Sequence, residues 1–308
     1  MKRIATLTLN PTIDASYEVD RIVPTHKVRT RHERYEAGGG GINVARVFCR
    51  LGGAVECVYF SGGGTGAAFD GLVDDLNLPR RRIAIAEPTR IASAVHETET
   101  GQEYRFVPAG PTITAEECER CLDLLREIEC DYFVASGSLP PGVPADFYVR
   151  AGEIARARGI AFVLDTSGEA LKATLGAGGV LLVKPSGGEL RQFTGRELET
   201  PEEFGAAAMD VVTAGRAELV AVTLGHKGAV LARKEGTTFL PAIPIEARSA
   251  VGAGDSFLAT MLFALASGRD PVDAFRYGMA GGAASVLTPG TGLAHPEDIE
   301  RLFAMVAA

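Results

Sequence analysis

The sequence predicts an α/β protein with a mostly parallel central sheet, helices on both of its faces and a small β-sheet lid. Short apolar runs alternate with amphipathic stretches along most of the chain, and several of these runs are apolar throughout. Two polar segments in the N-terminal half interrupt this alternation. Strands that alternate with helices form parallel sheets, and strands covered on both faces lack polar residues. A chain of 308 residues can build one such domain.

The apolar runs are expected to be buried strands, because they are short and carry few charges. In chain order they are Ile4–Leu9, Ala54–Phe60, Tyr132–Ser136, Ala161–Asp165, Val180–Val183 and Leu219–Thr223. The stretches with helical periodicity include Ile42–Leu51, Ala115–Ile128, Pro144–Arg158 and Pro201–Ala214. Thr114 and Glu117 have the spacing of a capping box at the start of the second of these helices.

The two polar segments, Ala15–Ala37 and Thr89–Val107, predict the lid. Each sets single apolar residues among charged ones, which is typical of antiparallel strands with one exposed face. We expect the two segments to form one small sheet that projects from the body. No linker, repeat or low-complexity tract divides the sequence, so residues 1–308 are expected to form a single domain.

Composition narrows the functional class. The net charge of −8 argues against a nucleic-acid surface. No apolar run reaches the roughly 20 residues that span a bilayer, and the first residues lack a signal peptide, which predicts a cytoplasmic protein. Five scattered cysteines indicate a reducing compartment. Cys118 and Cys121 have CxxC spacing, but without a second ligand pair we expect two ordinary helix residues rather than a metal site.

The most specific motif lies in Val251–Phe257. Its glycines allow a tight turn into an apolar helix, whose first amides can bind an anion. A carboxylate beside such a site suggests a general base, so Asp255 is expected to take a proton from a hydroxyl. The amides of Gly252, Ala253 and Gly254 would stabilise a phosphoryl group in transfer. The alternative is a plain helix start, with Asp255 as its cap.

A second motif follows the first strand. Asn10–Asp14 places the Asp14 carboxylate at the sheet edge where ligands bind in such folds. Gly38–Gly41 then runs directly into a helix, so that a ligand can touch bare backbone, and Asn43 in the first turn can hydrogen-bond sugar hydroxyls. The alternative for Asp14 is an ordinary turn residue, and the alternative for Gly38–Gly41 is a flexible loop. Glycines that lead straight into an apolar helix make a poor flexible linker.

Three further strand ends carry weaker signals. Ser136–Gly142 has the composition of a rigid turn in contact with substrate. Lys184–Glu189 ends in a carboxylate that either holds a metal through water or is a solvated helix-start residue. Thr223–Gly228 forms a glycine turn suited to nucleotide phosphates. The sequence has no GxxxxGK[ST] motif, no complete GxGxxG motif and no Ser-His-Asp pattern, so those site types are not supported.

Positive charge is concentrated in the lid segments, at Lys27, Arg29, Arg31, Arg34, Arg90 and Arg105. Arginine matches phosphate geometry with paired hydrogen bonds. Charges on exposed strands more often serve solvation and edge protection, and this alternative holds for most of them. A sugar that carries its own phosphate would still need two or three such groups.

Taken together, these motifs resemble the ribokinase-like carbohydrate kinase family, over nearly the whole chain from Thr6 onward. Gly38–Arg46 is similar to the N-terminal signature of this family, and Val251–Phe257 is similar to its GAGD signature. The resemblance implies a ribokinase-like three-layer fold, with ATP and Mg²⁺ as cofactors and a sugar hydroxyl as the phosphoryl acceptor. It leaves open whether a monovalent cation is needed. The turn Gly290–Gly292 is a further candidate for binding a cation or nucleotide.

The resemblance also implies a role for each matched residue. Asp255 would be the base, and Gly252, Ala253 and Gly254 would form the anion hole. The sugar would be held by Asp14, Gly39, Gly40, Asn43 and Ser138, and its phosphate by Lys27, Arg29, Arg90 and Arg105. ATP would lie against Lys184, Ser186, Thr223, Gly225 and Gly228, and Glu189 would organise magnesium through water.

Two positions refine this expectation. Members of the family that act on fructose 1-phosphate or tagatose 6-phosphate usually have lysine in place of Gly40. Gly40 therefore favours fructose 6-phosphate, phosphorylated at its free primary hydroxyl to give fructose 1,6-bisphosphate. The family usually shows an Asn-x-x-Glu motif, where this chain has Ser186 and Glu189. The shorter side chain predicts weaker handling of magnesium or ATP.

Alternative functions remain. One is a kinase for fructose 1-phosphate or tagatose 6-phosphate, and a kinase for nucleosides or unphosphorylated sugars is disfavoured by the basic lid. Another is a sensor that binds sugar phosphate or nucleotide without turnover, which the intact GAGD motif disfavours. The apolar residues on one side of the lid predict a homodimer in which the lids pack together.

Overall fold

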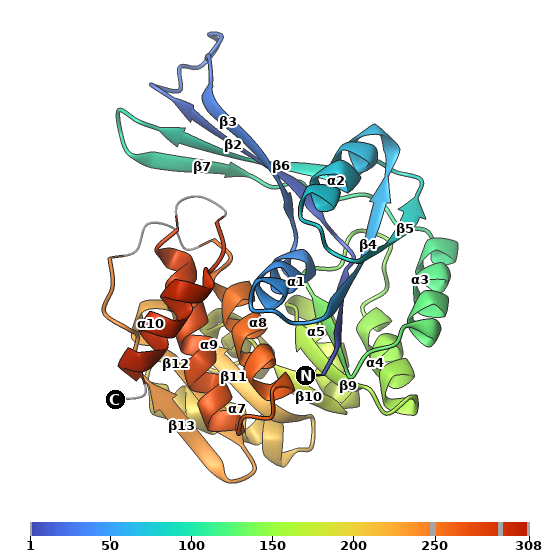
Figure 1. Ribbon diagram of the computed structural model, residues 1–308, viewed down its shortest axis with the longest axis vertical. Helices are drawn as coiled ribbons and strands as arrows, with labels where there is room; N and C mark the ends of the chain where they lie inside the picture. Colours follow the sequence, from blue (N-terminus) through green and yellow to red (C-terminus); the bar gives the residue numbers. More distant parts are fainter. Residues whose placement is uncertain (1, 247–250, 289–291, 307–308) are drawn as a thin grey trace.

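The computed structural model describes residues 2–246, 251–288 and 292–306. It shows a large layered body and a small sheet that projects from one side of it (Figure 1). Among the described residues, no helix is both long and apolar enough to cross a bilayer. The predicted fold class, a mostly parallel sheet with a small β-sheet lid, is confirmed.

The body is built on a nine-stranded sheet with the order β13-β12-β11-β10-β9-β8-β1-β4-β5. Neighbouring strands are parallel from β5 across to β11, whereas β12 and β13 form an antiparallel extension. The strands are β1 (Ile4–Thr8), β4 (Val55–Gly62), β5 (Arg80–Ile85), β8 (Tyr132–Ser136), β9 (Ala161–Asp165), β10 (Val180–Val183), β11 (Ala217–Thr223), β12 (Ala229–Arg233) and β13 (Gly236–Leu240). The carboxyl ends of the parallel strands therefore share one edge of the sheet, where ligands bind in such folds.

Helices cover both faces of this sheet and divide the core in two. One core cluster involves α1 (Gly40–Arg50), α2 (Gly63–Asp75), α8 (Ala253–Ala266), α9 (Pro271–Val286) and α10 (Pro296–Val306). The other involves α3 (Ala115–Glu127), α4 (Phe147–Ala157), α5 (Gly168–Ala177), α6 (Gly187–Thr194) and α7 (Pro201–Thr213). Along β1, Ile4 contributes to the first cluster and Ala5 and Leu7 to the second, as the alternation of side chains in a strand requires.

The predicted strands and helices are present, with boundaries that differ by a few residues. The largest difference at a helix start is α4, which begins at Phe147 rather than at Pro144. The capping box of Thr114 and Glu117 is confirmed at the start of α3, where both of its hydrogen bonds form. Cys118 and Cys121 lie buried on that helix as free thiols, and burial raises the pKa of Cys118.

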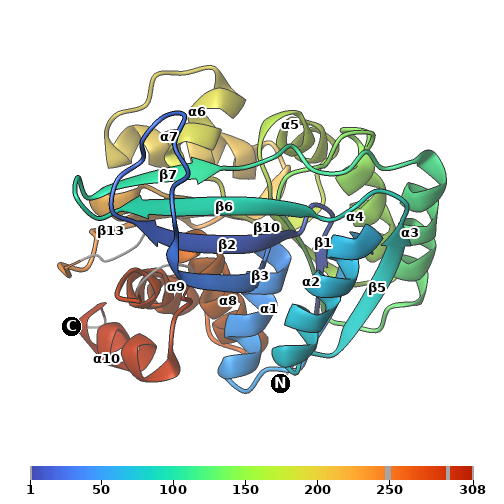
Figure 2. The ribbon, with the colours of Figure 1, turned by 90° about the horizontal axis from the view of Figure 1, so that it is seen from above.

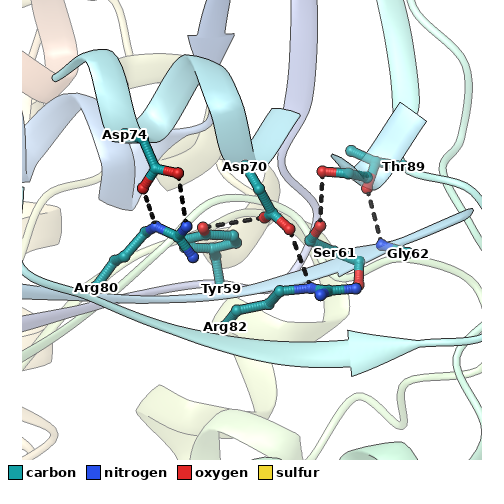
Figure 3. A network of polar contacts seen from close by, with 9 residues as sticks. Tyr59, Ser61, Gly62, Asp70, Asp74, Arg80, Arg82 and Thr89 are labelled. Carbon is teal, nitrogen blue, oxygen red and sulfur yellow. Dashed lines mark hydrogen bonds and ion pairs between the residues drawn. The ribbon is translucent and has the colours of Figure 1, made fainter. Parts of the chain in front are cut away.

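Strand β5 and helix α2 were not predicted, because arginines and glycines conceal them in the sequence. Their charged side chains pair with one another at the surface of the body (Figure 3). The Tyr59 hydroxyl on β4 donates to Asp70 Oδ1 on α2 at 3.1 Å, and Arg82 Nε of β5 lies 3.2 Å from Asp70 Oδ2. Arg80 of β5 donates twice to Asp74. The network fastens the edge strand of the sheet to the helix beside it.

The lid is a four-stranded sheet of order β3-β2-β6-β7, and its strands lie side by side when the molecule is viewed from above (Figure 2). They are β2 (Thr12–Val19), β3 (Arg31–Gly38), β6 (Arg90–Glu97) and β7 (Gln102–Phe106). The hairpins β2–β3 and β6–β7 are antiparallel, as expected, but β2 and β6 pair in parallel at the centre. This follows because each of the two strands leaves the same edge of the body.

Candidate active site

The candidate active site lies at the carboxyl ends of the parallel strands, where two helices also begin. A cavity of about 230 Å³ opens there, and it receives residues that follow β8, β9 and β10 together with the first turns of α1 and α8. It is lined by Gly40, Ser136, Gly137, Ser138, Asp165, Thr166, Ser167, Glu189 and Asp255. Residues far apart in the sequence thus meet in one small, polar space.

Gly252 turns the chain into α8. It precedes the helix with φ of 72°, a left-handed conformation that suits glycine, and a Cβ at this position would lie 2.5 Å from Leu293 Cδ2. The first helical hydrogen bond runs from Ser256 N to Gly252 O, so the amides of residues 253–255 precede the helical ladder. Asp255 does not cap the helix. The alternative interpretation of Asp255 as a plain helix cap is therefore wrong.

The Asp255 carboxyl has the environment of a proton acceptor. Burial, with Asp165 nearby, raises its pKa from 3.8 to about 6, and Asp14 adds to the rise. A hydrogen bond from Asn43 Nδ2, 2.9 Å from Asp255 Oδ2, and the charge of Lys184 both lower this pKa. A carboxyl that titrates near pH 6 is ionised at neutral pH and still basic enough to accept a proton.

A buried ion pair lies beside Asp255. Lys184 Nζ, at the end of β10, is 3.1 Å from Asp165 Oδ1, at the end of β9. Burial alone would lower the pKa of Lys184, but Asp165, Asp255 and Glu189 raise it overall. The ammonium therefore stays charged and places one fixed positive charge among several carboxylates.

Asp14 approaches from the lid. Burial raises its pKa to about 6, while the charges of Arg105 and Arg90 lower it. Asn43 belongs to the first turn of α1, and Gly39 precedes that helix as its N-cap. A Cβ on Gly40 would lie 2.3 Å from Ser136 Oγ, which it would displace, and 3.4 Å from Asp255 Oδ1, which it would only touch. The structure thus brings three of the predicted sugar-side residues, Asp14, Gly40 and Asn43, close to Asp255.

The basic residues of the lid divide into two groups. Arg105 on β7 and Arg90 on β6 face Asp14, but the guanidinium of Arg90 already donates to the carbonyls of Asn10, Pro108 and Pro11. Lys27 and Arg29 lie in the connection between β2 and β3, beyond the end of β2 that is far from the cavity. A strand of that length spans roughly 25 Å. Within one chain the structure does not bring Lys27 and Arg29 to the cavity.

Ser138 lines the cavity, and its hydroxyl accepts a hydrogen bond from Asn10 Nδ2 at 3.4 Å. Ser136, the first residue of the predicted substrate turn, also lines it, as do Asp165, Thr166 and Ser167, which were not predicted as site residues. Each of them ends or follows a parallel strand, β8 or β9. That position was the signal that could have identified them.

The residues expected to contact ATP lie along the neighbouring strand ends. Lys184 follows β10, Thr223 ends β11 and forms a β-bridge with Ser186, and Gly225 and Gly228 flank the short 3₁₀ turn after β11. Ser186 caps α6: its hydroxyl accepts from Glu189 N, and its own N–H donates to Glu189 Oε2 at 2.7 Å. Gly290 and Thr291, expected near a cation or nucleotide, lie outside the described residues.

A magnesium ion fits this arrangement. In the part of the chain that the structure describes, no cluster of three or more His, Cys, Asp or Glu side chains forms a cage for a metal. Glu189 and Asp165 line the cavity as two carboxylates. Mg²⁺ at phosphoryl-transfer sites commonly binds one or two carboxylates, with water and substrate phosphates as its remaining ligands.

Comparison with known proteins places this chain in a family. The model of the pfkB family carbohydrate kinases matches residues 7–298. The ATP-dependent 6-phosphofructokinase isozyme 2 of Mycobacterium tuberculosis is 44% identical over 307 residues, which cover 99% of this chain and 90% of that protein. The protein of the same name from Escherichia coli is 37% identical, with full coverage of both chains.

Solved structures agree with the sequence comparison. Phosphofructokinase-2 from Escherichia coli in complex with potassium superposes with a TM-score of 0.96 at 36% identity, over 100% of both chains. The same enzyme in complex with fructose-6-phosphate, and in a tetrameric inhibited form, gives TM-scores of 0.93, again at 36% identity and full coverage. From its sequence, its fold and the arrangement of its cavity, the chain belongs to the pfkB family of carbohydrate kinases.

Proposed function

We propose that the protein is an ATP-dependent 6-phosphofructokinase, which phosphorylates fructose 6-phosphate at its free primary hydroxyl and yields fructose 1,6-bisphosphate, a step of glycolysis. The observation that carries this proposal is Asp255, a half-buried carboxyl that lines the cavity in the first turn of a helix at the sheet edge, with a pKa near 6. Relatives with 44% and 37% identity bear this name, and full-length coverage supports the same reaction here.

In this mechanism Asp255 takes the proton of the sugar hydroxyl while the sugar oxygen bonds to the γ-phosphorus of ATP and the bond to ADP breaks. The amides at the start of α8 face the transferred group and stabilise its charge. Little covalent chemistry is required of the protein, so positioning and electrostatics supply most of the rate. Magnesium, when bound near Glu189 and Asp165, would neutralise charge on the phosphates.

The sugar would lie between Asp14, Asn43 and Ser138, with its phosphate toward Arg105 and Arg90. Arg105 is the sharper test of this placement, because Arg90 also holds three backbone carbonyls together. Arg105→Ala should raise KM for the phosphorylated sugar about tenfold and leave KM for ATP unchanged, as expected for the loss of one charged contact. An unchanged KM for the sugar would remove Arg105 from the phosphate site.

The proposal also covers the domain organisation, a monovalent cation and the oligomeric state. The body and lid act as one kinase domain over residues 1–308. A monovalent cation assists the reaction, in keeping with the potassium complex of the Escherichia coli enzyme. The protein is a homodimer through its lid. That enzyme also has a tetrameric inhibited form, so the size of the assembly needs its own measurement.

The deciding experiment measures ADP release with Mg-ATP against fructose 6-phosphate, fructose 1-phosphate, tagatose 6-phosphate, ribose and adenosine. We expect kcat/KM for fructose 6-phosphate to exceed the others at least tenfold. A preference for another phosphorylated ketose would keep the mechanism but reject the inference from Gly40. ATP binding without turnover of any sugar would favour the sensor, which ligand-dependent stabilisation would then reveal.

A further inference from the structure

The contact between Asn43 and Asp255 joins two helices that begin 213 positions apart, α1 at Gly40 and α8 at Ala253. Asn43 Nδ2 donates to Asp255 Oδ2 at 2.9 Å. Asn43 has so far been given one role, that of a ligand for sugar hydroxyls. Its amide nitrogen, however, is directed at the carboxyl that takes the proton, which suggests a second role.

The two oxygens of Asp255 have different surroundings. Oδ2 accepts from Asn43, whereas Oδ1 lies 3.4 Å from the point where a Cβ of Gly40 would stand. That point is also 2.3 Å from Ser136 Oγ, a buried hydroxyl with no hydrogen-bond partner among the described residues. Gly40, Ser136 and Asp255 all line the cavity, so Oδ1 is the oxygen on the side of Asp255 that faces these cavity residues.

The position of Asn43 is fixed by its helix. The Asn43 N–H donates to Gly39 O at 2.9 Å, which is the first helical hydrogen bond of α1. At the other end of α1, Arg50 donates to the carbonyls of Leu293 and Ala294. Ala294 N in turn donates to Ser256 Oγ, in the first turn of α8. The end of α1 is therefore tied to the start of α8, in addition to the amide contact at the start of α1.

We propose that Asn43 is a positioning residue for the catalytic base: its amide holds Asp255 Oδ2, so that Oδ1 receives the proton from the acceptor hydroxyl. The proton moves from the sugar hydroxyl to Oδ1, the sugar oxygen bonds to the γ-phosphorus, and the bond between that phosphorus and ADP breaks. This inference rests on the proposed kinase function, and it adds that Asn43 acts on the enzyme's own carboxyl as well as on the sugar.

Other charged groups also act on Asp255. Asp165 and Asp14 raise its pKa, and Lys184 lowers it. Glu189 lines the same cavity from α6. All of these remain in a variant at position 43. The hydrogen bond from Asn43 favours the ionised carboxylate, so its loss must raise the pKa of Asp255.

The test compares wild type with Asn43→Ala and Asn43→Asp. In each of the three proteins the Asp255 carboxyl is titrated by NMR with ¹³C-labelled aspartate. Its signal is assigned by its absence in Asp255→Asn. In Asn43→Ala we expect the pKa of Asp255 to rise by about one unit, a tenfold change in the ionisation constant. In Asn43→Asp, a second carboxylate at hydrogen-bond distance should raise it further. The acid limb of kcat/KM should move in the same order.

Ser138→Ala is the matched control, because it removes another polar group of the sugar site without touching Asp255. It should raise KM for the sugar and leave the pKa of Asp255 in place. Alanine favours helix, so Asn43→Ala should fold. If it does not, Asn43→Asp still provides the test, because aspartate keeps the shape of the asparagine side chain. An unchanged pKa of Asp255 in the Asn43 variants, with a raised KM alone, would show that Asn43 binds only sugar and would overturn the inference.

The NMR titration needs no turnover, so the two proposals can fail separately. If the enzyme releases no ADP with any phosphorylated sugar, the proposed kinase function is wrong. A raised pKa of Asp255 in both Asn43 variants would still support the contact between Asn43 and Asp255. If fructose 6-phosphate is turned over and this pKa does not move, the function stands and the positioning role fails. Asp14 also titrates near pH 6, which makes the assigned NMR signal, rather than the pH–rate profile alone, decisive.

Discussion

Asp255 is the side chain on which the proposed chemistry depends most, and its burial has a cost for stability. We expect Asp255→Asn to lower kcat at least about 100-fold, because an amide cannot act as a general base. The same change keeps an oxygen that can accept from Asn43. Initial-rate ADP release at saturating substrate measures the effect, and a kcat near that of wild type would exclude Asp255 as the base.

The stability of the same variant should depend on pH. Burial raises the pKa of Asp255 from 3.8 to about 6, so the unfolded chain loses this proton at lower pH than the folded protein does. The folded protein therefore loses stability as pH rises through that window. Because asparagine cannot ionise, Asp255→Asn should be more stable than wild type at pH 8, by at most about 3 kcal/mol, and by less at pH 4. Urea unfolding at both pH values measures this, and an equal difference at the two would contradict it.

Ser136 occupies the space that a side chain at position 40 would need. A side chain at position 40 would meet Ser136 Oγ at 2.3 Å. Gly40→Ala should therefore displace Ser136 or the start of α1, and lower kcat/KM for fructose 6-phosphate about tenfold, in line with the typical cost of overpacking. Ser136→Gly in the same chain should restore part of the loss.

The measurement is kcat/KM for the two single variants and the double variant, read as a double-mutant cycle. Additive effects would mean that the two positions act independently. In that case the preference inferred from Gly40 would need another physical cause.

At the scale of elements, the start of α6 offers a test of the proposed magnesium site that leaves the fold intact. Ser186 caps this helix through a capping box with Glu189. Asparagine caps helices as well as serine does, so Ser186→Asn should fold normally and isolate the effect on magnesium. The longer side chain should lower the Mg²⁺ concentration for half-maximal rate about threefold, the value of one modest hydrogen bond.

Ser186→Ala serves as the control for this variant. It removes the cap and should cost about 1 kcal/mol of unfolding free energy without improving the use of magnesium. Identical magnesium titrations for wild type and Ser186→Asn would refute the idea that serine weakens metal handling.

The elements also show what the sequence could predict and what it could not. Buried strands such as β8 and β9 were predicted with their observed boundaries, because their apolar runs are uninterrupted. Strand β5 was missed because its arginines resemble a loop until α2 supplies their carboxylates. At the site, helix-start glycines marked Asn43 and Asp255, whereas Asp165 was predicted only as the last residue of a buried strand. Lys27 was predicted near the substrate phosphate from the family resemblance, which does not say how far the lid strands carry this residue from the cavity of its own chain.

At the scale of the molecule, the lid sheet has two different faces. Residues paired across its strands point to the same side, so Tyr35, Ala15, Ser93 and Phe106 form one row across the sheet. Ile13 and Ile91 form the next row on that side. Asp14 and Arg105 belong to the opposite, polar face. The polar face is the one that turns toward the cavity, which leaves the apolar face outward.

This outward face is the basis for the proposed homodimer. Tyr35, Ile91 and Phe106 are exposed by 53%, 41% and 59%, which is unusual for large apolar side chains gathered on one sheet. A second lid packed on this face would remove them from water. Phe106→Asp would place a carboxylate in that contact, where its desolvation is costly. We therefore expect Phe106→Asp to dissociate the assembly at micromolar concentration.

Light scattering after size exclusion measures the mass, which should be twice that of one chain for wild type and that of a single chain for Phe106→Asp. His96→Asp is the matched control, since it adds the same charge at an exposed position on the polar face and should leave the mass unchanged. Dissociation by both variants would point to general repulsion between acidic chains rather than to a lid contact. A wild type of single-chain mass at every concentration would mean that the apolar face stays open in solution, and the lid would then have to exclude water from the cavity without the support of a second copy.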